Sequence, residues 1–188
     1  LAVRPQQLAL VREDLGGACV PVSLSNRIEA TKRTNLQAGG VTIEMVEHVL
    51  SALAALGVDC CEVHLTAAEL PGLDGSADAY VDAIDQVGIE PLDGTVTNPL
   101  VVQAPLTVSA VSGDGVIEVA PPTTSGLRVQ YSVEYPGSPI PPQQYEVAVT
   151  PQRYREDVAA ARTFLLEEEA RKLQKDGVGL TVTTQDLI

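Results

Sequence analysis

Long apolar runs and basic residues are what this sequence has least of. No stretch of about 18 consecutive apolar residues is present, so we expect no transmembrane segment, and no basic-then-apolar leader marks export. The chain has 12 Lys and Arg residues against 25 Asp and Glu residues. The resulting formal charge of −13 argues against nucleic acid or an anionic membrane surface as a partner. We therefore expect a cytosolic protein.

Cysteine, histidine and methionine are also scarce, at three, two and one residues. Cys19, Cys60 and Cys61 are odd in number and lack the spacing of a zinc ribbon, which predicts free thiols rather than disulfides. Because Met45 is the only methionine, the sequence carries no initiator. We expect it to be an internal piece of a longer protein.

An apolar content of 45% over 188 residues is enough for a sizeable core. Alternating apolar residues predict short strands within residues 1–24, separated by Pro5 and by Gly16-Gly17, and a further strand over Cys60–Thr66. Residues 90–99 are rich in Pro, Asp, Gly, Thr and Asn. This composition predicts a boundary between an N-terminal domain, 1–94, and a C-terminal domain, 99–188.

Four more strands are predicted after that boundary, and the first two flank a hairpin signal at Ser112–Gly115. Two helices follow, the first with Thr150 as its N-cap and Pro151 at its first position. The predicted strands are Leu100–Ala110, Val116–Ala120, Leu127–Tyr135 and Tyr145–Val149, and the predicted helices are 151–162 and 165–175. Strands precede paired helices in both halves, which predicts an α+β fold.

The stretch Val41–Gly57 organises the chain, and the spacing of its apolar residues predicts one helix. Thr42 is the expected N-cap, Glu44 favours the positive end of the helix dipole, and Gly57 is the expected C-terminal stop. A polar turn with Lys32, Arg33, Thr34 and Asn35 leads into it. The predicted apolar face comprises Met45, Val46, Val49, Leu50, Leu53 and Leu56, and it leaves the pair Glu47-His48 outside the core.

Glu47-His48 allows two interpretations. The first is a solvated helix face that happens to carry a histidine. The second is a metal or acid–base site, in which a neutral imidazole is the ligand and the carboxylate is the base for a bound water. A zincin helix is excluded because Ala52 and Leu53 occupy the region where its second histidine would lie.

Two other features have ordinary structural interpretations. His64, on the strand predicted over Cys60–Thr66, is expected to be structural or solvated. Asp74-Gly75-Ser76 reads as a turn before a second helix over Ala77–Val87, with Ser76 as its N-cap and an end at Gly88.

Three ordered motifs, Val46–Asp59, Glu69–Ala77 and Ala161–Phe164, resemble the UDP-3-O-acyl-N-acetylglucosamine deacetylase family of lipid A biosynthesis. The turn at Arg33–Leu36 agrees with the same family. This resemblance extends over nearly the whole chain. It implies two similar α+β domains, each a β-sheet packed with α-helices, and an active site in the cleft between them.

The resemblance also implies a chemistry for individual residues. His48 matches one of the ligands, two His and one Asp, of a catalytic Zn²⁺, and Glu47 matches the general base that deprotonates water. Thr163 matches the hydroxyl that steadies the oxyanion, Phe164 lies in the substrate region, and Asp74 is carried over only as structural support. The remaining ligands are expected beyond Ile188. The expected substrate is a UDP-linked acylated glucosamine, and the oligomeric state is not indicated.

Two functional hypotheses follow. In the first, the parent protein is a zinc-dependent amidohydrolase that removes acetate from this substrate, while the 188 residues alone are inactive. In the second, the chain is a non-catalytic structural fragment or relic that keeps the fold without a complete metal site, since one histidine is too few ligands for stable zinc.

Overall fold

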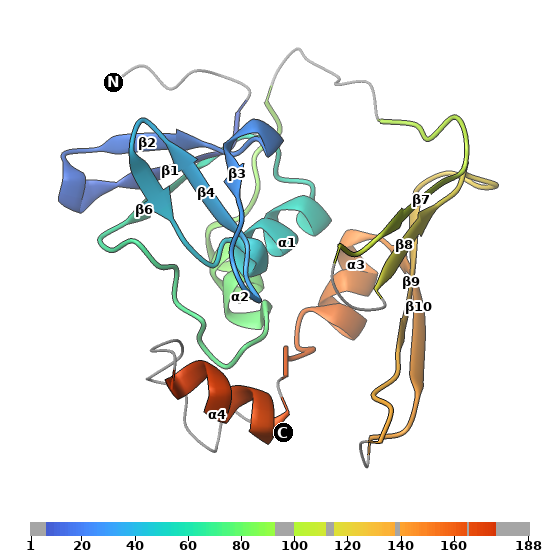
Figure 1. Ribbon diagram of the computed structural model, residues 1–188. Coiled ribbons are helices and arrows are strands. Elements are labelled where there is room, and N and C mark those ends of the chain that lie inside the picture. Colours follow the sequence, from blue (N-terminus) through green and yellow to red (C-terminus); the bar gives the residue numbers. More distant parts are fainter. Residues whose placement is uncertain (1–6, 93–99, 112–114, 138–139, 165, 176–188) are drawn as a thin grey trace. The chain divides into compact units, whose positions relative to one another are not determined.

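The computed structural model (Figure 1) describes residues 7–92, 100–111, 115–137, 140–164 and 166–175 as a mixed α+β fold with several small sheets and a few helices. Contacts between Cα atoms divide the chain into two compact units. The first unit is Leu1–Ile89 with Tyr154–Ile188, and the second is Glu90–Arg153. The segment from Tyr154 onward thus groups with the N-terminal residues, whereas the predicted division at 94–99 placed it in the second domain. The division into two domains stays a prediction.

Two three-stranded sheets form the first unit. One contains β1 (Ala9–Arg12), which pairs antiparallel with β2 (Ala18–Pro21) and parallel with β6 (Glu62–Leu65). The other has the order β3 (Arg27–Ile28), β4 (Asn35–Ala38) and β5 (Val41–Ile43). Two short 3₁₀ turns, η1 (Glu13–Leu15) and η2 (Leu24–Asn26), connect the strands. The strands predicted after residue 6 are confirmed, and those predicted before it lie outside the described residues.

The helix predicted over Val41–Gly57 begins six residues later than expected, because Val41–Ile43 is a strand. β4 and β5 form an antiparallel hairpin that turns at Gly39-Gly40, with φ of 58° and 79°. Positive φ at two successive residues is the requirement of a tight hairpin turn, and glycine meets it without steric cost. The prediction of Thr42 as N-cap and Glu44 in the first helical turn was therefore wrong: Thr42 lies in β5, and Glu44 forms a bridge to Glu69.

Helix α1 (Glu47–Leu56) ends as predicted, at Gly57 in the left-handed conformation. The amide of Gly57 donates to the carbonyl of Ala54, and the amide of Val58 donates to that of Leu53. These two bonds are the Schellman pattern, which satisfies carbonyls that a helix end leaves open. Helix α2 (Asp78–Val87) ends at Gly88 as predicted and lies beside α1 in Figure 1.

Two apolar clusters hold the first unit together. One joins both sheets to the predicted apolar face of α1, where Val46, Val49 and Leu53 are buried. The other packs α1 and α2 against the segment after residue 153, and it consists of Ala52, Leu56, Ala77, Val81, Tyr154 and Ala159. Ala52 is fully buried where α1 packs against α2. The predicted apolar face of the helix did not include it. The hydroxyls of Ser51 and Tyr154 are hydrogen-bonded in the same region.

The second unit contains two antiparallel hairpins. β7 (Leu106–Ser109) pairs with β8 (Val116–Val119), and β9 (Leu127–Val133) pairs with β10 (Gln143–Val149). All four predicted strands of this region are confirmed, although β7, β8 and β9 are shorter than predicted and β10 begins two residues earlier. The predicted hairpin turn, Ser112–Gly115, lies outside the described residues except for Gly115.

The helix predicted over 151–162 is much shorter. α3 (Pro151–Arg153) begins as expected, with the Thr150 hydroxyl oxygen accepting from the Arg153 amide at 3.1 Å. A π-helical turn, η3 (Tyr154–Val158), follows, and the helix then ends. The amide of Ala159 donates to the Tyr154 carbonyl five residues back, and residues 161–164 belong to no helix or strand. The last predicted helix is observed as α4 (Glu167–Lys175). No helix within the described part of the chain has the length and apolar character needed to cross a membrane.

Candidate functional site

Glu47 and His48 occupy the first turn of α1, and both side chains are partly buried. One carboxylate oxygen of Glu47 accepts a hydrogen bond from the backbone amide of Thr34 at 3.0 Å. The first turn is the positive end of the helix dipole, which also favours a carboxylate. On a fully solvated helix face this carboxylate would bind only water, whereas here it accepts a hydrogen bond from the backbone of Thr34.

The turn that leads into α1 is held in an uncommon backbone conformation. Met45 has a φ of 58°, which a residue with a side chain rarely adopts. Its amide donates to the side-chain oxygen of Asn35 at 3.3 Å, and the next amide, of Val46, donates to the carbonyl of Thr34 at 3.1 Å. The direction in which Glu47 leaves the turn is thus set by two residues of the preceding segment.

Arg33 connects this turn to the loop before α2. Its guanidinium contacts the carboxylates of Glu44 at 2.9 Å and Glu69 at 3.0 Å. The backbones of the same two segments are also bonded: the amide of Glu44 donates to Ala68, and the amide of Leu70 donates to Glu44. The segment just before the first motif is therefore bonded to the start of the second, and Ala52 and Leu56 of the first motif share a buried cluster with Ala77 of the second.

The Asp74-Gly75-Ser76 loop is a hydrogen-bonded turn. Asp74 accepts from the hydroxyl and the amide of Ser76 at 2.7 and 3.0 Å, and these bonds lower the pKa of Asp74. The hydroxyl of buried Ser76 accepts from the amide of Asp78 at 3.2 Å. Ser76 thus binds the first residue of α2, but the helix begins one residue later than expected and its N-cap is Ala77, so the prediction of Ser76 as N-cap was wrong.

The same loop holds the third motif. The amide of Thr163 donates to the carbonyl of Gly75 at 2.8 Å, and the guanidinium of Arg162 donates to the carbonyl of Asp74 at 2.6 Å. Thr163 is exposed and Phe164 is partly buried. Residues some 90 positions apart thus meet at one loop, and the side chain of Thr163 remains available to a bound molecule.

The described residues do not form a complete metal site. Among them, no group of three or more His, Cys, Asp and Glu side chains is arranged to hold a metal ion. His64 is half-exposed and contacts Glu13 and Glu62, and its bond to Glu13 is the main cause of its raised pKa. It is solvated, as predicted. The three cysteines are free thiols, also as predicted.

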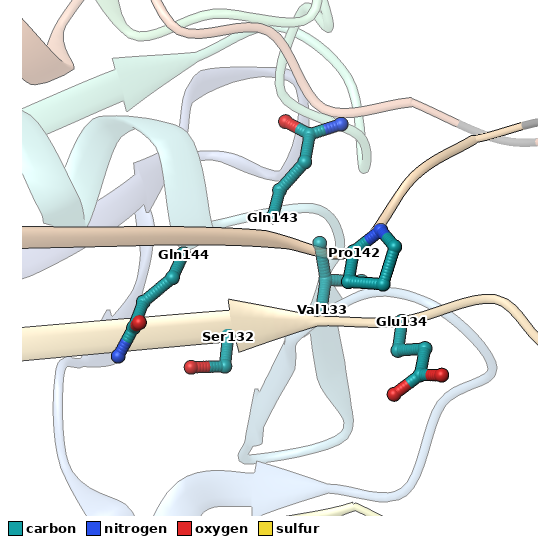
Figure 2. Close-up of a pocket in the computed structure, with 6 residues that line it drawn as sticks. All are labelled: Ser132, Val133, Glu134, Pro142, Gln143 and Gln144. Atoms are coloured by element: carbon teal, nitrogen blue, oxygen red, sulfur yellow. The ribbon is translucent and has the colours of Figure 1, made fainter.

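A pocket in the second unit is lined by other residues. Figure 2 shows it at the ends of β9 and β10, where it is lined by Ser132, Val133, Glu134, Pro142, Gln143 and Gln144. None of the four predicted site residues lines it. It is an open surface feature with one carboxylate, and it offers no pair of groups for acid–base work.

The sequence did not predict the bonds at the start of α1. These bonds come from Arg33, Thr34 and Asn35. The sequence predicted that this polar turn leads into the helix, but it did not predict hydrogen bonds between the turn and the helix start. The signal that could have revealed them is Gly39-Gly40. A tight hairpin there folds β4 back on β5, so that the residues before β4 return to the residues after β5.

Comparisons with known proteins agree on one family for the chain. The family model described as "UDP-3-O-acyl N-acetylglycosamine deacetylase" matches residues 2–188. A protein named UDP-3-O-acyl-N-acetylglucosamine deacetylase from Syntrophus aciditrophicus is 31% identical over 185 residues, covering 96% of this chain and 57% of the relative. Relatives with the same name from Thermosynechococcus vestitus and Chlamydia muridarum are 33% and 31% identical, each over 89% of this chain and 57% of its own length. The chain thus spans little more than half the length of these relatives.

Proposed function

Because the chain belongs to the UDP-3-O-acyl N-acetylglycosamine deacetylase family, we propose that the protein of which it is part hydrolyses the acetamide of UDP-3-O-acyl-N-acetylglucosamine. The reaction releases acetate and leaves a free amine, and it serves lipid A biosynthesis in the cytosol. In this proposal the fold has two similar α+β domains, with the active site in the cleft between them.

One observation carries the proposal. Within the first unit, Ala52 and Leu56 of the first motif share a buried cluster with Ala77 of the second, and the bond between Thr163 and Gly75 joins the third motif to the second. The third motif is far from the other two in the sequence, so local folding alone does not explain their association. A cluster that holds a carboxylate, an imidazole and an exposed hydroxyl matches the needs of amide hydrolysis.

The residues of this chain divide the work as follows. The Glu47 carboxylate takes a proton from the attacking water, whose oxygen forms a bond to the acetamide carbon. The hydroxyl of Thr163 donates a hydrogen bond to the oxyanion of the tetrahedral intermediate. Collapse of the intermediate breaks the C–N bond as the amine nitrogen takes up the proton that Glu47 removed from the water. The acetic acid so formed loses its remaining proton to the amine, which gives acetate and the protonated amine. Phe164 provides an apolar contact for the substrate.

Zinc is part of the proposal, and His48 is its proposed ligand in this chain. A bound zinc supplies a Lewis acid and lowers the pKa of its water to near neutrality. The described residues do not fit a complete zinc site, since a catalytic zinc needs three protein ligands and His48 is one. The steps assigned above are therefore those of Glu47, Thr163 and Phe164 alone.

Acetate release by the full-length protein tests the proposal. UDP-3-O-acyl-N-acetylglucosamine is incubated with the protein as purified, after treatment with a chelator, and after zinc is added back. We expect acetate release as purified, a loss of at least about a hundredfold after chelation, and recovery with zinc. Absence of acetate release from the zinc-loaded protein would reject the proposed reaction.

The second candidate function is the non-catalytic relic, favoured by the single metal ligand among the described residues. A relic would bind the UDP-sugar or nothing, and it would release no acetate in the same assay. The family match over residues 2–188 favours the enzyme.

A further inference from the structure

We propose that Asn35 is a positioning residue for Glu47: its buried side-chain oxygen fixes the strained turn that aims the carboxylate. The inference rests on the proposed function for the role of Glu47 as a base. The placement of the carboxylate, however, is argued from geometry alone.

The first step is the strain at Met45. Its φ of 58° lies in the left-handed region, where a residue with a side chain costs about 1–2 kcal/mol more than in the right-handed one. Such a conformation persists only where the surrounding structure holds it. The side-chain oxygen of Asn35, which accepts from the Met45 amide at 3.3 Å, is the contact that the structure places there.

The second step is the burial of Asn35. The residue is 8% exposed and lies in β4, paired with Ile28 of β3. A buried amide side chain has few water molecules to replace a lost partner, so its bond to Met45 is worth more than a surface bond. The sheet fixes the backbone of Asn35, and the acceptor is therefore presented from a rigid element.

The third step links the turn to the carboxylate. Thr34, the residue before Asn35, donates its amide to Glu47 at 3.0 Å and accepts from the Val46 amide at 3.1 Å. Two adjacent residues thus bind three successive positions of the chain that enters α1. If Met45 relaxed to a right-handed φ, the start of α1 would rotate and the Thr34–Glu47 bond would break.

Two variants and a matched control test this role in the full-length, zinc-loaded protein. Asn35→Ala removes the acceptor, and Asn35→Asp keeps an oxygen in the same place. Gln37→Ala is the control: Gln37 lies on the same strand, and its amide binds the Thr42 hydroxyl at 2.8 Å within the hairpin, without contact to the turn. Each variant is checked by circular dichroism and by its urea midpoint.

We expect Asn35→Ala to lower kcat by about ten- to a hundredfold with KM changed by less than about threefold, because a misplaced base weakens the transition state more than substrate binding. Asn35→Asp is expected to recover kcat to within about tenfold of the wild type, and Gln37→Ala to leave it unchanged. A folded Asn35→Ala protein with wild-type kcat would overturn the inference, as would equal losses in Asn35→Ala and Gln37→Ala.

Amide hydrogen exchange gives a second readout that does not depend on turnover. Exchange at the Thr34 amide is expected to accelerate at least about tenfold in Asn35→Ala, the equivalent of one lost hydrogen bond, and to stay at the wild-type rate in Gln37→Ala and Asn35→Asp. Unchanged Thr34 exchange in Asn35→Ala would overturn the inference. If Asn35→Ala does not fold, Asn35→Asp decides, since rapid Thr34 exchange there would show that the acceptor oxygen is not what holds Glu47.

The two proposals fail separately. If no form of the protein releases acetate, the proposed function is rejected, and the exchange data alone decide whether Asn35 places the Glu47 carboxylate.

Discussion

The ionised carboxylate of Asp74 is stabilised by hydrogen bonds within its own turn. Two hydrogen bonds from Ser76 favour its ionised form and lower its pKa, while its backbone carbonyl accepts from Arg162. The side chain is exposed, so the gain is modest. Its role in the site is to hold the turn from which Gly75 binds Thr163, which agrees with the structural support inferred from the sequence.

The first prediction concerns the pH dependence of this turn. A carboxyl group whose pKa is lowered by folding stabilises the folded state above its unfolded pKa of about 3.9, and that contribution is lost as the pH falls through the folded pKa. Asp74→Asn keeps the accepting oxygen and removes the charge. We expect the variant to unfold at lower urea than the wild type at pH 7, and the difference to vanish as the pH falls below about 4.

The control for this prediction is Ser76→Ala, which removes the main donor. In that background Asp74→Asn should change the urea midpoint less than it does in the wild type, because the two side chains act on the same bond. A midpoint difference that persists unchanged down to pH 2 would show that the charge of Asp74 contributes nothing.

At the scale of elements, the start and the end of α1 have different physical origins. The end is local: Gly57 adopts φ 76° and ψ 24°, and its amide bonds complete a Schellman pattern. The start is set by tertiary bonds, because Val46 has no side-chain cap and Thr34 and Asn35 supply the contacts. This difference explains why the end could be predicted and the start could not.

The second prediction follows from the local end. Gly57→Ala forces a residue with a side chain into the left-handed conformation, and we expect a loss of about 1–2 kcal/mol in the free energy of unfolding. Gly57→Asn should lose less, because asparagine tolerates this conformation better. No atom outside the neighbouring residues lies within 4 Å of an added Cβ, so steric collision adds nothing. Equal stability of Gly57→Ala and the wild type in urea unfolding would contradict this account.

At the scale of the whole molecule, the sequence predicted what depends on local pattern. It predicted the strands β7 to β10, the glycine stops of α1 and α2, and the apolar face of α1. It missed β5, although Val41, Thr42 and Ile43 are all β-branched and favour a strand, because Thr42 and Glu44 also suit the start of a helix. It also missed the π-helical turn that shortens the helix after Pro151, since the bonds of Thr163 to Gly75 and of Ala77 to Ala159 are tertiary.

The candidate site shows the same limit. Residue spacing alone did not decide whether Glu47-His48 is a solvated helix face or a metal or acid–base site. Only the resemblance to a family identified Thr163 and Phe164 as candidate site residues. No local signal joins residues 69–77 to residues 159–164. The catalytic and metal-binding roles of Glu47, His48, Thr163 and Phe164 stay predictions.

The third prediction concerns zinc and the 188 residues alone. His48 is the one proposed ligand, and the described Cys60, Cys61 and His64 form no metal-binding group with it. We expect zinc binding weaker than micromolar and no hydrolysis, because a catalytic zinc draws on three protein ligands. Calorimetric titration measures this. Micromolar or tighter one-to-one binding that is lost on His48→Ala would show that ligands within this chain complete the site.

The central claim is that Glu47 is the general base of a deacetylase, and Glu47→Gln in the full-length protein tests it most directly. Glutamine keeps an oxygen that can accept from the Thr34 amide, so the fold, the turn and the zinc content should be preserved while the base is lost. We expect acetate release from UDP-3-O-acyl-N-acetylglucosamine to fall by about 10²–10⁴-fold, with Glu62→Gln, at an exposed position on β6, retaining the wild-type rate. A wild-type rate of acetate release in Glu47→Gln would contradict the account and remove Glu47 from the mechanism.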